Sequence, residues 1–190
     1  MSWFERNSGS VGGSFYAKME EKAGKIAPGS DGLMFLPYFM GSTVPNWQTS
    51  IRGAVLGISL NHRREHIFRA YMEGVGFEVL SQSQVYEERG LDINSVRMIG
   101  GATRSPNWPA IISDMLGLPV TIPENQEGAS LGASMMAGMG SGKFSSWREA
   151  VEVMVGKRTT IEPRAGNTEK YRELMRAFHS ALDCLPRKNG

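Results

Sequence analysis

The segment from Met98 to Trp108, MIGGATRSPNW, carries residue types that could bind a nucleotide. Gly100 and Gly101 end an apolar run, and glycines let a backbone approach a ligand without a Cβ clash. Ser105 suits the N-cap of a helix and Pro106 its first residue, and a helix start attracts anions. The segment matches neither the Rossmann nor the P-loop pattern. A plain tight turn would use the same residues, so a ligand loop and a turn both remain open.

A second feature is the run of small residues in EGASLGASMMAG, residues 127–138. On a helix, the four residues Gly128, Gly132, Ala133 and Ala137 form a strip along which a backbone or a flat ligand could lie. We favour close helix packing for most of these positions.

Groups suited to acid–base or metal chemistry are sparse. Asp114 and Glu73 fall inside predicted helices without an identifiable partner, and no nucleophile has a base beside it. Asp31 and Asp92 fall in turns, where aspartate is common. The single cysteine, Cys184, is expected to be buried or idle. The three histidines are too scattered for a metal cluster.

Composition excludes several classes of protein. The 190 residues suit one domain, and the net charge of +2 is too balanced for a nucleic-acid or anionic-membrane partner. No apolar run approaches the roughly 18 residues of a membrane span. The N-terminus lacks a signal-peptide core, so the expected location is the cytoplasm.

The elements that must position the glycine segment follow from hydrophobic periodicity. Strands are expected at residues 33–36, 54–60, 95–100 and 118–123, with an extended piece at 158–163. Helices are expected at residues 14–26, 64–89, 105–117, 127–139, 145–155 and 168–185. This alternation predicts an α/β domain with a partly parallel sheet. In the longest helix, Gly74 and Gly76 either admit a neighbouring backbone or mark a kink.

From about Leu33 to Ala137 the sequence resembles the C-terminal domain of the FGGY carbohydrate kinases, which include xylulose, glycerol, gluconate and ribulose kinases. One block of the family, which contains the second of its signature patterns, is similar to the segment FLPYFMGSTVPNWQTSIRGAVLGISLNHRREHIFRAYMEGVGF. Tyr71 departs from that signature. IGGATRSPNWPAIISDMLGLPV resembles the adenosine loop and its helix, and EGASLGASMMAG resembles a later family helix. EGVGF and GGATRSPNW look closer to xylulose kinases, whereas VPNW and EGASLGAS are also similar to glycerol kinases.

The resemblance implies an actin/hexokinase-like (ribonuclease H-like) ATPase fold that uses ATP and Mg²⁺ and lies on the nucleotide side of a sugar kinase. Gly100, Gly101 and Ala102 would lie against the adenine and ribose. Ser105 would lie near the nucleotide, with its capping role as the competing explanation. Residues 45–47 (Pro45, Asn46 and Trp47) match a loop on the cleft side, to which we assign no substrate contact.

The resemblance also implies that catalytic residues and metal ligands lie outside this chain, because the family's base, phosphate loops and most magnesium ligands come from upstream segments. Residues 1–190 would be a partial domain cut on its N-terminal side. It would comprise a remnant helix end with Trp3 and Phe4 and a linker (1–13), the core with the nucleotide loop (30–140), and C-terminal helices (141–190). The sugar would bind through the missing N-terminal half. The chain alone would be inactive and could self-associate.

Two alternatives remain. The substrate could be glycerol, gluconate or ribulose rather than xylulose. The chain could also be a non-catalytic relic or a domain that docks onto a partner.

Overall fold

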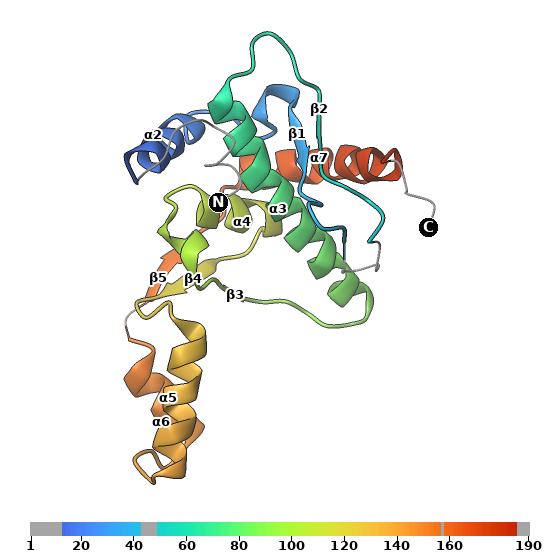
Figure 1. Ribbon diagram of the computed structural model, residues 1–190. Coiled ribbons are helices and arrows are strands. Elements are labelled where there is room, and N and C mark those ends of the chain that lie inside the picture. The colour runs from blue at the N-terminus through green and yellow to red at the C-terminus, as the bar shows by residue number, and fades with distance from the viewer. Residues whose placement is uncertain (1–12, 43–48, 157, 186–190) are drawn as a thin grey trace.

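The computed structural model describes residues 13–42, 49–156 and 158–185 (Figure 1). Its helices and strands are α2 (Gly13–Ala23), β1 (Met34–Leu36), β2 (Ala54–Leu56), α3 (Arg64–Glu88), β3 (Val96–Arg97), α4 (Trp108–Leu116), β4 (Val120–Pro123), α5 (Gly128–Gly140), α6 (Trp147–Met154), β5 (Arg158–Ile161) and α7 (Ala165–Asp183). The expectations for residues 1–12 and 45–47 lie outside the described residues. Gly13, expected in a linker, is the first residue of α2.

The strands form two separate sheets. β3 and β4 pair in parallel, with Val96 opposite Val120, and β5 joins the other edge of β4 in antiparallel orientation. The prediction of a partly parallel sheet is therefore confirmed. β1 and β2 instead form their own antiparallel ribbon, with Phe35 opposite Val55.

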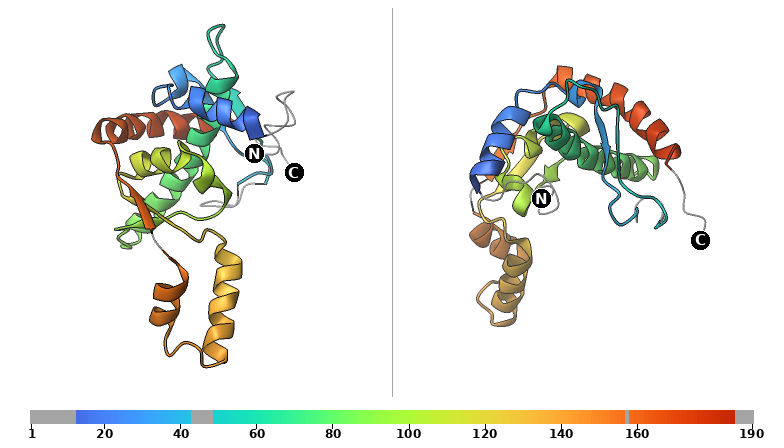
Figure 2. Two further views of the ribbon diagram at one scale, coloured as in Figure 1. Left: turned by 90° about the vertical axis from the view of Figure 1, so that its left-hand side faces the viewer. Right: turned by 45° about the horizontal axis from the view of Figure 1, so that its top comes forward.

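Helix α3 is the central support of the fold, in contact with α2, α4 and β1 (Figure 2). A Cβ atom on Gly74 would lie 2.1 Å from the carbonyl oxygen of Phe35. The absence of a side chain therefore lets β1 approach α3, as the first of the two interpretations predicts. Gly76 admits the Met115 side chain rather than a backbone, since a Cβ there would lie 2.3 Å from Met115 Sδ.

The main hydrophobic core lies among α2, α3, α4 and α7. α7 contributes the apolar face expected from its periodicity, with Tyr171, Met175 and Phe178 fully or almost fully buried. The helix begins at Ala165 rather than at Thr168, because the backbone N–H of Arg164, just before it, is held by Asp114 Oδ1 at 2.8 Å. Among the described residues, no helix combines the length and apolar character needed to span a membrane.

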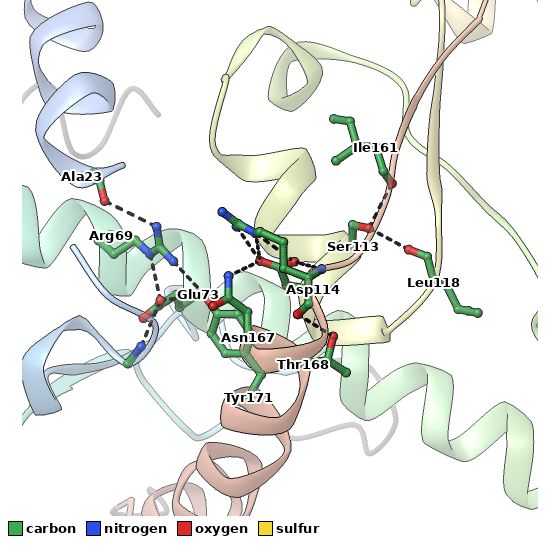
Figure 3. Close-up of polar contacts among 12 residues, drawn as sticks. Ala23, Arg69, Glu73, Ser113, Asp114, Leu118, Ile161, Asn167, Thr168 and Tyr171 are labelled. Carbon is green, nitrogen blue, oxygen red and sulfur yellow. Dashed lines mark hydrogen bonds and ion pairs between the residues drawn. The ribbon is translucent and has the colours of Figure 1, made fainter. Parts of the chain in front are cut away.

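Two buried carboxylates tie these helices together (Figure 3). Glu73 on α3 accepts hydrogen bonds from Arg69 on the same helix and from Tyr171 on α7. Asp114 on α4 binds the Arg164 guanidinium and accepts from Asn167 Nδ2 at 2.8 Å. Both carboxylates, which had no identifiable partner in the sequence, therefore connect elements distant in the chain.

Helices α5 and α6 form a hairpin that projects from the rest of the molecule (Figures 1 and 2). Met135, Phe144 and Ala150 make a small core of its own. Ser146 caps α6 by accepting from Glu149 N at 3.2 Å.

The expected close packing of the small residues of α5 is wrong at three positions. A Cβ on Gly132 would meet nothing within 4 Å, and Ala133 and Ala137 are exposed. Gly128 does pack closely, against Ile99. Cys184 is exposed, not buried.

Candidate functional site

The segment MIGGATRSPNW folds into a tight turn and a short 3-10 helix, Gly101–Arg104, before α4 begins. Gly100 has φ 82° and ψ −168°, a conformation open almost only to glycine. Its N–H donates to Gln126 O at 3.2 Å, and its carbonyl accepts from Thr103 Oγ1 at 2.6 Å. The turn interpretation therefore explains Gly100.

Gly101 has no such explanation within the described structure. It is exposed, its φ lies outside the glycine-favouring range, and a Cβ added to it would meet nothing within 4 Å. Packing therefore does not require a glycine here, and the backbone of Gly101 is open to a ligand.

Ser105 lies two residues before Asn107, the N-cap of α4. Its Oγ accepts from the backbone N–H of Asn107 at 3.2 Å and of Trp108 at 2.9 Å. The prediction of Ser105 as the N-cap residue and Pro106 as the first helical residue is wrong by two positions, because the N-cap is Asn107 and α4 begins at Trp108 with Pro109 in its first turn. The N–H groups of Asn107 and Trp108 are occupied by Ser105, so they are not free to hold a phosphate.

A hollow of about 550 Å³ lies between α2 and this segment. Its lining comprises Tyr16, Ala17, Glu20 and Glu21 from α2, and Gly101, Arg104, Ser105 and Pro106 from the segment. The structure therefore brings Gly101 and Ser105 together at one hollow. Ala102 instead packs against the main hydrophobic core.

Charges at the hollow are unevenly distributed. Glu21 is ionised at neutral pH, since a hydrogen bond from Lys25 and the positive charge of Lys25 lower the pKa of its exposed carboxyl. Arg104 lies at the rim, 3.7 Å from the exposed Glu127, and also lines a second hollow of about 680 Å³ on its other side, beside residues 124–127 and 154–156.

Asn107 joins α2 to the segment, a connection that the sequence did not reveal. Its Nδ2 donates to both the backbone oxygen and Oε2 of Glu20, each at 2.7 Å. A Cβ on Gly24 would lie 2.6 Å from Asn107 Oδ1, so α2 ends directly against this side chain. Glu20 is 7% exposed, and its Oε1 is buried with no hydrogen-bond partner among the described residues.

The described residues offer no obvious base or metal centre. Glu73 and Asp114 are occupied by the bonds that hold the helices together. Within residues 13–42, 49–156 and 158–185, no three His, Cys, Asp or Glu side chains gather where they could hold a metal ion.

Comparisons with known proteins identify the family to which this fold and this segment belong. Residues 5–141 match the model of the FGGY family of carbohydrate kinases, C-terminal domain. The chain is 31% identical over 174 residues to a xylulose kinase of Bacillus subtilis, covering 92% of this chain and 34% of that protein. It is 32% identical over 164 residues to a gluconokinase of the same organism, covering 86% and 32%. The chain thus spans about a third of the length of these relatives.

The fold has solved counterparts. The crystal structure of xylulose kinase from Rhodospirillum rubrum superposes with a TM-score of 0.81 at 29% identity, over 96% of this chain and 36% of that one. The expected α/β, actin/hexokinase-like fold is therefore confirmed. With a family model matched over residues 5–141, the chain belongs to the FGGY family of carbohydrate kinases and carries its C-terminal domain.

Proposed function

We propose that this chain is the nucleotide side of an ATP-dependent sugar kinase and that the hollow between α2 and the Gly101 segment receives the nucleoside part of ATP. The observation that carries this is Gly101, which lines the hollow without any packing need for a glycine. A glycine at such a place allows close contact between backbone and ligand.

The polarity of the hollow favours the neutral end of the nucleotide. It holds the carboxylate of Glu20, the carboxylate of Glu21 paired with Lys25, and the guanidinium of Arg104, so it offers a triphosphate no excess of positive charge. In the adjoining turn, the first N–H groups of α4 already bond to Ser105. The base and ribose therefore occupy the hollow, and the phosphates extend away from it.

The proposed reaction is phosphorylation of a sugar hydroxyl by ATP with Mg²⁺, with xylulose as the first candidate substrate. Similarity to a xylulose kinase over most of this chain supports that choice, although similarity to a gluconokinase is of the same order. Glycerol and ribulose remain alternatives from the family resemblance. We place the catalytic base, the sugar and most magnesium ligands in parts of the protein beyond these 190 residues.

Replacing Gly101 by valine is expected to abolish binding of ADP, measured by calorimetry or by ligand-observed NMR at millimolar nucleotide, because the isopropyl group would project where the ligand lies. The fold should be unaffected, since a Cβ there meets nothing within 4 Å. Gly166→Val is the matched control: it too adds a Cβ in open space, but at the start of α7. Unchanged affinity in Gly101→Val would move the site elsewhere.

The purified chain alone is expected to give no ADP release above background with D-xylulose, glycerol or gluconate in a coupled assay. Phosphoryl transfer depends on positioning and charge neutralisation at the γ-phosphate, and those groups are proposed to lie outside this chain. Turnover above background would contradict this placement.

The docking-domain alternative has one observation in its favour. Met40, Ile58 and Leu60, around the β1–β2 ribbon, are largely or fully exposed, and apolar side chains in such numbers are typical of contact surfaces. Such a domain would retain this surface and show no nucleotide binding in the titration above, whereas the kinase proposal requires binding.

A further inference from the structure

The floor of the hollow between α2 and the Gly101 segment is made of two buried polar side chains, Glu20 and Ser105. Each is 7% exposed, whereas Ala17, Glu21, Gly101, Arg104 and Pro106 around them are exposed. A ligand that reaches the floor therefore meets a carboxylate and a hydroxyl.

Asn107 fixes both groups. Its side-chain amide donates to Glu20 Oε2 at 2.7 Å, and its backbone N–H donates to Ser105 Oγ at 3.2 Å. Because Ser105 Oγ also accepts from Trp108 N, the hydroxyl proton of Ser105 remains to be donated. The floor thus offers one donor and one acceptor held by a common residue.

The acceptor is left unsatisfied in the described structure. Glu20 Oε1 is buried with no hydrogen-bond partner among the described residues. A buried polar atom without a partner destabilises the folded chain, so such atoms call for an explanation. A ligand that supplies a donor here removes this destabilisation on binding.

We propose, on the basis of the function above, that Glu20 is a specificity-determining residue of the nucleotide site and that its Oε1 accepts a hydrogen bond from the exocyclic amino group of adenine. Oε1 is buried in the structure without a ligand, so the proposal includes a rotation of the carboxyl group that turns Oε1 toward the hollow when the base binds. Adenine carries a donor next to a ring-nitrogen acceptor, which matches the pair formed by Glu20 and Ser105. Tyr16, Ala17 and Pro106 add apolar surface beside which a base can lie.

The test compares ADP with IDP, whose hypoxanthine base carries a carbonyl oxygen where adenine carries the amino group. The unchanged chain is expected to bind ADP more tightly than IDP. In Glu20→Gln the amide oxygen can still accept from Asn107, while the amide NH2 takes the place of Oε1 and donates. The ratio of ADP to IDP affinity should therefore fall about tenfold or more, as expected for loss of a hydrogen bond to a charged group.

Glu21→Gln is the matched control, because it removes the same charge from a neighbouring carboxylate that Lys25 Nζ already binds at 2.8 Å. It should leave the ratio unchanged. The ratio also cancels any change in the folded fraction of a variant, so loss of stability cannot mimic the result.

The outcomes separate this inference from the proposed function. If neither nucleotide binds, or if Gly101→Val leaves binding intact, the proposed nucleotide site is wrong. If ADP binds and Gly101→Val abolishes it, but Glu20→Gln leaves the ratio unchanged, the base-reading role alone is overturned. An equal loss for both nucleotides would also overturn it, since Glu20 would then contact the ribose that ADP and IDP share.

Discussion

Replacing Glu73 by glutamine is expected to lower the free energy of unfolding by about 3–5 kcal/mol, the range for breaking a buried ion pair from one side. Glu73 is 2% exposed and is surrounded by donors (Figure 3). Arg69 Nε lies 2.8 Å from its Oε1, Tyr171 OH 2.9 Å from the same oxygen, and Ser30 Oγ 2.8 Å from Oε2. A glutamine amide would turn an NH2 group toward donors and leave the Arg69 guanidinium buried without a counter-charge.

Tyr171 cannot compensate for the lost charge. Burial, followed by the negative charge of Glu73, raises the pKa of Tyr171 above its ordinary value. Burial is the larger cause and persists in Glu73→Gln, so the phenol stays protonated and supplies no negative charge. Arg69 Nη2 donates to that phenol oxygen at 2.8 Å. The network therefore depends on one negative charge, that of Glu73.

Urea unfolding followed by circular dichroism measures the effect. The control is Glu173→Gln, which removes an exposed carboxylate 3.0 Å from Lys170 Nζ. Exposed pairs of this kind contribute about 1 kcal/mol or less. A loss in Glu73→Gln no larger than in Glu173→Gln would show that the buried network does not hold α3 against α7.

Half of this network could be inferred from sequence and half could not. Arg69 and Glu73 are four residues apart on a helix that periodicity predicts correctly, and that spacing alone places them on one face. Tyr171 lies 98 residues further on, and no local pattern selects it from the apolar face of α7. Gly29 and Ser30 bind Glu73 from a turn in which Ser30 adopts φ 49°. No sequence pattern predicts that backbone conformation for a serine.

The candidate site divides in the same way. The glycines and the hydrogen-bonding role of Ser105 follow from local chemistry, so the Gly100–Ser105 segment could be located in advance. The opposite wall of the hollow could not, because Glu20 meets Asn107 across 87 residues. The predicted start of α4 is two residues too early, because Ser105 Oγ accepts from the N–H groups of Asn107 and Trp108 in a turn that precedes the helix, and Asn107 is the N-cap. The prediction of close packing along the small-residue strip of α5 is wrong at three positions because small residues allow close packing only where another element of the fold lies against them.

Replacing Gly74 by alanine is expected to destabilise the fold by about 2–3 kcal/mol or more, at the upper end of the range for overpacking. The added Cβ would lie 2.1 Å from the carbonyl oxygen of Phe35 and 3.2 Å from its carbonyl carbon. The obstacle is backbone, which cannot rotate away as a flexible side chain can. β1 and α3 would have to separate, although alanine gains about 1 kcal/mol over glycine within a helix.

Gly132→Ala is the matched control, because it makes the same change inside α5 where the new Cβ meets nothing within 4 Å. It should raise stability by up to about 1 kcal/mol, so thermal unfolding of the two variants should move in opposite directions. A neutral Gly74→Ala would mean that β1 is free to withdraw from α3. α3 also contacts α2, which lines the hollow, and α4, which follows the Gly101 segment. The sign of this one substitution therefore reports how firmly α3 supports the elements on either side of the candidate nucleotide site.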